Sequence, residues 1–141
     1  MTKFVLTIAS ILMFSTITFG ATPPTEVLKA FKLKFPTAKK VKWDKENEHE
    51  FEASFLLNGI KYATNYTDKG EWLETESPLT FLQLPKEVQT SFSTSHKKDK
   101  PRLVSKIEQA KGVIKYEIEI KKGIKTVEFF YTANGIETTE K

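Results

Sequence analysis

Cysteine is absent from the 141 residues of this chain, and histidine occurs only twice. Without thiols the protein can form no disulfide, hold no iron–sulfur cluster and use no cysteine nucleophile. The two histidines, His49 and His96, stand far apart and lack any zinc-binding spacing. A serine nucleophile would need one of them as its base, and a glycine-rich phosphate loop is missing as well. These absences predict a protein that is not an enzyme and that carries no cofactor.

An excess of charge of either sign is also missing. The chain has 22 lysines and arginines against 18 aspartates and glutamates, which gives a net charge of +4. Lysines gather in two short clusters, 39–42 and 97–100, and are otherwise interleaved with glutamates. Proteins that bind nucleic acids usually concentrate positive charge on one face. The sequence therefore predicts no nucleic-acid partner, and the two clusters are expected to be solvated loops and strand faces.

The chain opens with an apolar stretch of secretory character. Lys3 precedes a hydrophobic run from Phe4 to Phe14, and small and polar residues follow as far as Gly20. This order is typical of a signal peptide, and the run is shorter than the ~20 residues that a membrane-spanning helix needs. We therefore predict a signal peptide at residues 1–20. The mature protein would be periplasmic or secreted from a bacterium, with no membrane span after cleavage.

The remaining chain, residues 21–141, carries one pattern twice, at about 23–76 and 84–137. Each half opens with a proline-led helical stretch, at Pro24 and at Pro85, and two glycine turns follow at matching distances. The offset between matched positions drifts by only a few residues. Such self-similarity is typical of a tandem duplication.

Hydrophobic periodicity predicts the elements of each half. The first helical stretch places Val27, Phe31 and Phe35 on one side, and the weaker second stretch places Val88 and Phe92 there. Strict alternation follows in segments 51–57, 60–67, 71–76, 102–110, 113–121 and 125–132, which is typical of strands with one buried face. We predict an α+β fold with one domain at 21–141. It would contain two pseudo-repeats, each a helix followed by an antiparallel β-meander.

Two groups of residues are candidates for partner contacts. Trp72, Glu74 and Glu76 alternate along one strand, so we expect them to share a face that could bind a basic peptide. A half-buried tryptophan beside solvated acids is the simpler interpretation. Leu56 and Phe130 place bulk on the otherwise polar face of their strands, which predicts exposed contact residues.

A series of glutamates is the candidate for metal binding. Glu46, Glu48, Glu50 and Glu52 recur at every second position, so those within a regular strand would line one face. Clustered carboxylate oxygens could hold calcium. No loop with EF-hand spacing accompanies them, which favours a solvated strand face neutralised by nearby lysines. We therefore predict no metal site and keep these glutamates as an alternative.

The order and spacing of the framework residues resemble a known family. The matching pattern is Pro24-x-x-Val27-x-x-x-Phe31-x-x-x-Phe35-Pro36-x-Ala38-x-x-Val41-x-Trp43, followed by Phe51-Glu-Ala53, Gly59, Asp68-x-Gly70-x-Trp72-x-Glu-Thr-Glu76 and Leu84-Pro85-x-x-Val88. In these residues the chain is similar to the β-lactamase-inhibitor-like, PepSY-like family of exported bacterial proteins. The resemblance implies a tandem helix-plus-sheet fold and a periplasmic or secreted location. It implies no particular activity, since a fold does not carry a function.

Together these features favour an exported, non-enzymatic binding or regulatory module of the cell envelope, of which an inhibitor is one form. Its partner would be an envelope or secreted protein or peptide, bound through the sheet. The alternative is a protein that binds a small ligand or calcium through the glutamate series. A hydrolytic enzyme is the least supported class, because base and metal motifs are missing.

Overall fold

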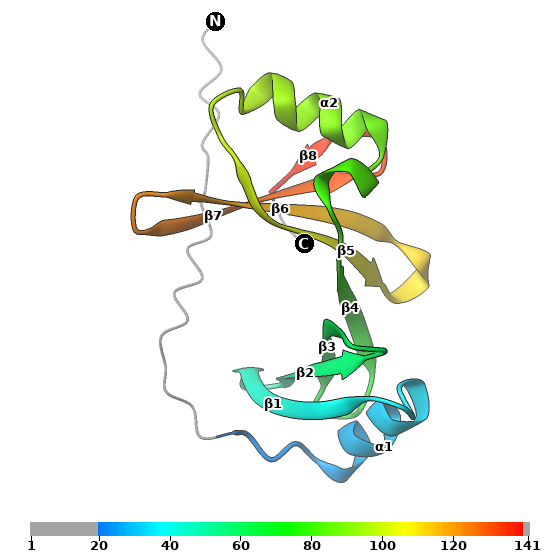
Figure 1. Cartoon of the computed structure of the whole chain (residues 1–141). Helices are drawn as coiled ribbons and strands as arrows, with labels where there is room; N and C mark the ends of the chain where they lie inside the picture. Colours follow the sequence, from blue (N-terminus) through cyan, green and yellow to red (C-terminus); the bar gives the residue numbers. More distant parts are fainter. Residues whose placement is uncertain (1–19, 140–141) are drawn as a thin grey trace, which may run out of the picture.

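The structure is a computed structural model that describes residues 20–139 (Figure 1). In chain order its elements are α1 (Thr25–Lys34), β1 (Lys39–Asn47), β2 (Glu50–Leu57), β3 (Ile60–Thr67), β4 (Trp72–Pro78), the 3-10 turn η1 (Phe81–Gln83), α2 (Lys86–Ser95), β5 (Pro101–Gln109), the 3-10 turn η2 (Ala110–Gly112), β6 (Ile114–Lys122), β7 (Lys125–Thr132) and β8 (Glu137–Thr138). The predicted signal peptide lies outside the described residues except for its last position. Neither α1 nor α2, the α-helices of the described part, has the length and apolar character that crossing a membrane requires.

The eight strands form one antiparallel sheet in which spatial order equals chain order, β1 to β8. The predicted α+β class is therefore confirmed. The sheet is strongly curved, and both helices lie on its outer side, α1 outside β1 and β2 and α2 outside β5 to β7 (Figure 1). One helix precedes four strands twice along the chain. That this order arose by tandem duplication stays a prediction.

The helices have the ends that their sequences favour. Pro24 and Pro85 occupy the N-cap positions, where a missing N–H costs nothing, and each cap leads into a first turn that contains a glutamate. The last turn of α1 carries Lys32 and Lys34, which suits the negative end of the helix dipole. The last turn of α2 carries no basic residue. Its stability therefore depends more on packing against the sheet.

Two apolar clusters fill the space between the sheet and the helices, and they differ in chemistry. The first cluster comprises Val27, Phe31, Phe51, Ala53, Phe55 and Tyr66, and the second comprises Leu84, Val88, Phe92, Val104, Ile118, Ile120 and Tyr131. Phe31 packs edge-on against Phe55 and Trp43, with ring centroids 5.1 and 5.2 Å apart. Such pairs add about 0.5–1.5 kcal/mol each beyond the burial of their area. The first cluster is thus built mainly from rings and the second mainly from branched aliphatic side chains.

Each helix is held against its strands by a glycine in a turn. Gly70 and Gly135 have φ angles of +83° and +76°, which favour glycine. A Cβ atom on Gly70 would stand 2.8 Å from the carbonyl oxygen of Glu26, and one on Gly135 would stand 2.5 Å from that of Glu87. The turns after β3 and β7 therefore lie directly against the first turns of α1 and α2.

Candidate functional site

The face of the sheet that neither helix covers is the candidate site, and we call it the helix-free face. Its side chains alternate along each strand with those of the two apolar clusters. Cross-strand rows on this face run Glu52–Asn65–Glu74–Gln109, then Ser54–Ala63–Glu76–Ile107–Lys115, then Ser105–Glu117–Phe130, and then Glu119–Glu128. The first two rows cross from the first four strands to the last four through the pairing of β4 with β5, so both halves of the chain contribute to one surface.

Four of the five predicted contact residues lie on the helix-free face. Glu74 and Glu76 belong to the rows just given, Phe130 stands opposite Glu117, and Leu56 stands between Lys61 and Lys39 of the neighbouring strands. They come from three different strands, β2, β4 and β7, so only the register of the sheet brings them onto one face.

Trp72 lies on the other face, contrary to the expectation that it shares a face with Glu74. Glu74 pairs with Asn65 and Trp72 pairs with Tyr66, so Leu73 is an extra residue that forms a bulge. The bulge turns the indole toward α1, where the Lys34 ammonium lies 3.8 Å from the ring centroid. The indole N–H donates a hydrogen bond of 2.9 Å to the Thr75 hydroxyl. Trp72 therefore belongs to the packing of the first cluster.

The middle of the helix-free face is buried. Phe130 and Glu74 are each 8% exposed and Ile107 is fully buried, although no helix covers this side. Because the sheet curves toward this face, neighbouring side chains converge and shield one another (Figure 1). The expected exposure of Phe130 is therefore wrong, while Leu56 and Glu76 are half-buried.

Negative charge dominates this middle region. It holds six carboxylates against the Lys115 ammonium and the Arg102 guanidinium, and the acids are Glu52, Glu74, Glu76, Glu117, Glu119 and Glu128. Buried charges are costly unless they are hydrogen-bonded. The Gln109 amide donates to the Glu74 carboxylate over 3.1 Å, the Ser105 hydroxyl donates to Glu117 over 3.5 Å, and the Arg102 guanidinium donates to Glu119. The face is thus acidic at its centre, with carboxylates that polar neighbours hold in place.

Three of these carboxylates are the metal-capable group that the structure brings together. Oxygen atoms of Glu117, Glu119 and Glu128 lie within 4.8 Å of one another in the described part of the chain. The predicted series does not form such a group, because a turn at residues 48–49 separates Glu46 on β1 from Glu50 on β2. Alternation along β6 could have placed the first two carboxylates together. The third depends on the pairing of Glu119 with Glu128 across strands, which the sequence does not reveal.

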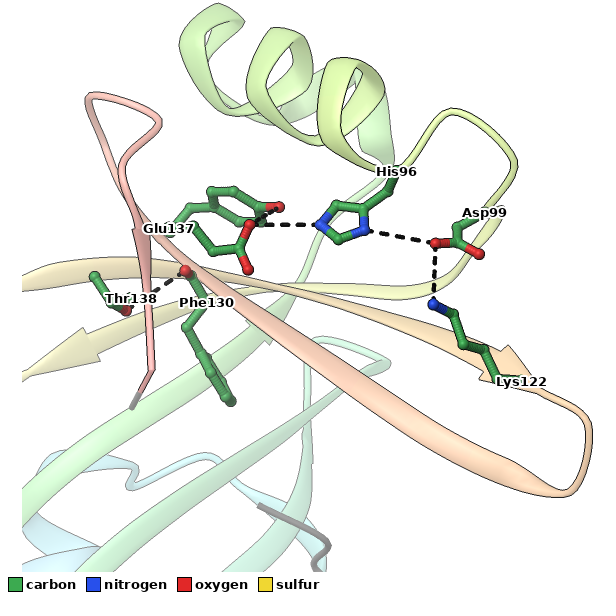
Figure 2. A network of polar contacts seen from close by, with 7 residues as sticks. His96, Asp99, Lys122, Phe130, Glu137 and Thr138 are labelled. Carbon is green, nitrogen blue, oxygen red and sulfur yellow. Dashed lines mark hydrogen bonds and ion pairs between the residues drawn. The ribbon is translucent and has the colours of Figure 1, made fainter. Parts of the chain in front are cut away.

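A second polar network ties the end of α2 to the sheet edge. The His96 ring lies with Nε2 3.4 Å from Glu137 and Nδ1 3.5 Å from Asp99, and Asp99 also pairs with the Lys122 ammonium at 3.6 Å (Figure 2). The Tyr131 hydroxyl donates to the same Glu137 carboxylate over 3.3 Å. Burial, together with this carboxylate, raises the pKa of Tyr131 well above its ordinary value. The network is structural in character, since it joins α2, β6 and β8.

The surface also has a hollow where β4 begins and β5 ends. Trp72, Glu108, Gln109, Gly112, Val113 and Ile114 line it. It is wide open to solvent, and Lys34 already occupies one face of the Trp72 ring. The hollow therefore offers less to a ligand than the helix-free face does.

Comparison with known proteins gives one family and a set of folds. Residues 50–136 match the family described as "Putative beta-lactamase-inhibitor-like, PepSY-like". A DUF2874 family protein from Bacteroides ovatus is 25% identical, with a TM-score of 0.72 over 84% of this chain and 86% of that one. None of the curated proteins matches this chain.

Two further solved structures share the fold at lower identity. A Bacteroides eggerthii protein described as "putative periplasmic" is 21% identical, with a TM-score of 0.74 over 83% of this chain and 86% of that one. A β-lactamase-inhibitor-protein-like (BLIP-like) protein from Bacteroides fragilis is also 21% identical, with a TM-score of 0.68 over 84% of each chain.

Proposed function

Because the chain belongs to the β-lactamase-inhibitor-like, PepSY-like family, we propose that it is a non-enzymatic binding module of the cell envelope. Its helix-free face would engage a protein or peptide partner, and inhibition of that partner is one form this binding could take. The helices would serve as the rigid support behind the sheet.

One observation carries this proposal. Both helices and both apolar clusters lie on one side of the sheet, while the other side has charged side chains in rows that include Leu56, Ile107 and Phe130. No helix covers this second side (Figure 1), so its half-buried side chains are accessible to a partner.

The charge of the face favours a partner segment rich in lysine or arginine. Six carboxylates against Lys115 and Arg102 give the middle region a net negative charge, and complementary charge steers association and selects partners. Glu74 and Glu76, the acids predicted to contact a basic peptide, lie in this region. Trp72 would take part only indirectly, by supporting β4 from the opposite side.

The proposed location is the periplasm or the cell exterior, after removal of residues 1–20. The secretory pattern of the first twenty residues supports it, and the "putative periplasmic" relative fits it. The proposed lack of catalysis is supported by the two histidines, which stand apart in different halves. Each histidine pairs with carboxylates of a local network.

We also propose that residues 21–141 form one domain built by tandem duplication. Support comes from the recurring element order and from the contact of Gly70 with α1 that recurs between Gly135 and α2. The continuous sheet across β4 and β5 supports a single unit.

A charge-reversal pair tests the binding face. Protein isolated from producing cells is immobilised, crosslinked to envelope proteins and analysed by mass spectrometry, in parallel with Glu76→Lys and Glu108→Lys variants. Glu76 lies on the helix-free face, and Glu108, which follows the cross-strand partner of Glu76, lies on the opposite face with an exposed side chain. We expect a captured protein to be lost with Glu76→Lys and kept with Glu108→Lys. Equal capture by both variants would contradict the proposed face.

Calcium binding is the second candidate, and it rests on Glu117, Glu119 and Glu128. An ion that binds only the folded state raises the melting temperature. The candidate predicts a rise with calcium that Glu128→Gln abolishes. If calcium leaves the melting temperature unchanged, calcium binding is excluded, and the protein-binding proposal is not affected.

A further inference from the structure

The tip of the β6–β7 hairpin exposes an isoleucine completely. β6 and β7 pair through Lys122 and Lys125, which leaves Gly123 and Ile124 as a two-residue turn. Gly123 has a φ angle of +63°, the glycine-favoured conformation at the first position of such turns. Ile124 therefore stands at the apex, where its side chain is 97% exposed, and the hairpin projects beyond the rest of the sheet (Figure 1).

Lysines from two segments lie on this hairpin and beside its base. Pro101 at the start of β5 pairs with Ile120 near the end of β6, so the loop after α2 lies beside the base of the hairpin. The Lys122 ammonium reaches Asp99 of that loop at 3.6 Å, a contact seen in Figure 2. The exposed lysines brought together in this way are Lys97, Lys98, Lys100, Lys121, Lys122 and Lys125. Asp99 lies among these six positive charges, and the pair Glu119 and Glu128 lies three positions further from the turn.

The corresponding hairpin of the first half differs in one respect. β2 and β3 pair through Leu57 and Ile60, so the turn there is Asn58-Gly59, with both residues at positive φ. Ile60 is thus the first residue of a strand rather than the apex of a turn, and it is 49% exposed. The two hairpins share the sequence Gly-Ile-Lys, but a shift of the turn by one residue presents the isoleucine at only one of them.

We propose that the β6–β7 tip is a docking element for an anionic phospholipid surface. The six lysines would lie against the headgroups, where each basic residue near an anionic surface strengthens binding. Ile124 would enter the boundary between headgroups and acyl chains, as the apolar residues of peripheral membrane proteins do. An acidic protein partner would satisfy the lysines but would leave an apolar apex between them without a purpose. This inference concerns a different surface from the helix-free face and does not depend on the function proposed above.

Vesicle binding tests this docking element. Protein isolated from producing cells, with its first residue determined by mass spectrometry, is sedimented with vesicles of phosphatidylcholine alone or of equal parts phosphatidylglycerol and phosphatidylcholine. We expect binding to the anionic vesicles only. Ile124→Ser should weaken the partition coefficient about tenfold, and Lys121→Gln with Lys125→Gln should weaken it roughly 25-fold.

Matched changes at the first hairpin serve as controls, namely Ile60→Ser and Lys39→Gln with Lys61→Gln. They should leave vesicle binding within about twofold of the parent. All these positions are exposed, so unchanged melting temperatures are expected throughout. The proposal is overturned if anionic vesicles are not bound, or if the first-hairpin changes weaken binding as much as the second-hairpin ones. Loss with the lysine changes but none with Ile124→Ser would also overturn it, because charge alone would then attract the tip to the headgroups without insertion of the apex.

Discussion

The two halves of the molecule share a contact between a turn glycine and a helix, but they differ two residues after that glycine. Gly70 packs against α1 and Gly135 packs against α2 in the same way. Two positions later the first half has Trp72, which packs with Lys34, and the second half has Glu137, which accepts hydrogen bonds from Tyr131 and His96. We call the contact of Trp72 with Lys34 the aromatic clasp, and Glu137 with its two hydrogen-bond donors the polar clasp. The same backbone contact is therefore followed by a different clasp in each half.

A buried tyrosine of the first half lacks the hydrogen bond that its counterpart in the second half makes. Tyr66 and Tyr131 occupy matching places in the two clusters and are both fully buried. The Tyr131 hydroxyl donates to Glu137, whereas the Tyr66 hydroxyl has no hydrogen-bond partner among the described residues. A buried polar group without a partner costs about 1–3 kcal/mol. The two halves therefore have in common the glycine–helix contact and the buried tyrosine, and they do not share either clasp.

The glycine contacts should be the most sensitive of these shared features. Gly70→Ala and Gly135→Ala should each cost roughly 3 kcal/mol or more, because the new Cβ meets a backbone carbonyl and the φ angle is positive. Gly59→Ala is the control, since its φ is also positive but open space surrounds it, and it should cost about 1 kcal/mol. Urea unfolding measures all three. A clear loss at one contact and none at the other would break the equivalence of the halves.

Alkaline pH should destabilise the protein through its buried tyrosines. Burial raises the pKa of Tyr66 from 10.0 to about 12. The unfolded chain therefore loses the proton first, so the stabilisation is fully present below pH 10 and is lost as the pH rises toward 12. The loss from this one group should be roughly 2 kcal/mol. Thermal unfolding between pH 9 and pH 12 should show a flatter curve for Tyr66→Phe than for the parent, and parallel curves would contradict the burial of this hydroxyl.

Removing each tyrosine hydroxyl at neutral pH sharpens the same comparison. Tyr131→Phe should cost about 1.5 kcal/mol, because it breaks a hydrogen bond to a carboxylate. Tyr66→Phe should be neutral or slightly stabilising, because it removes an unpaired buried oxygen. Chemical unfolding of the two variants side by side provides the measurement. An equal loss of stability in the two variants would contradict the difference in hydrogen bonding between Tyr66 and Tyr131.

The smallest effect is expected at the aromatic clasp. Lys34→Gln removes the ammonium that lies over the Trp72 ring and should cost about 0.5–1 kcal/mol. Lys32→Gln, in the same last turn of α1, is the matched control and should cost less than half as much. Thermal melts of both variants measure the difference. A larger loss of stability with Lys32→Gln would indicate that Lys34 stabilises the protein through the helix dipole rather than through the Trp72 ring.

Strong alternation in the sequence predicted most of the sheet. The segments 60–67 and 125–132 coincide with β3 and β7, and Tyr131 points inward while Phe130 points the other way, as predicted. The sequence does not predict the edge strand β1, because nearly all its side chains are exposed and lysines interrupt the apolar alternation. Lysines and bulges are common on edge strands, where they discourage pairing with another chain.

The candidate site was harder to predict, for three physical reasons. A bulge at Leu73 reverses the facing of Trp72, and nothing in the local sequence marks it. The burial of Phe130 follows from the curvature of the whole sheet, which single-strand patterns do not contain. The carboxylates from β4, β6 and β7 become one acidic region only through the register of strands distant in sequence.

Carboxylate footprinting tests the central claim, a binding site on the helix-free face, most directly. The protein is labelled at its carboxylates with and without the captured partner, and the labelling of each residue is read by mass spectrometry. The account predicts that Glu76 and Glu128, half-buried on the helix-free face, become protected while Glu108 on the opposite face does not. Protection of Glu108, or of Glu26 and Glu87 on the helices, with none at Glu76 and Glu128 would contradict it.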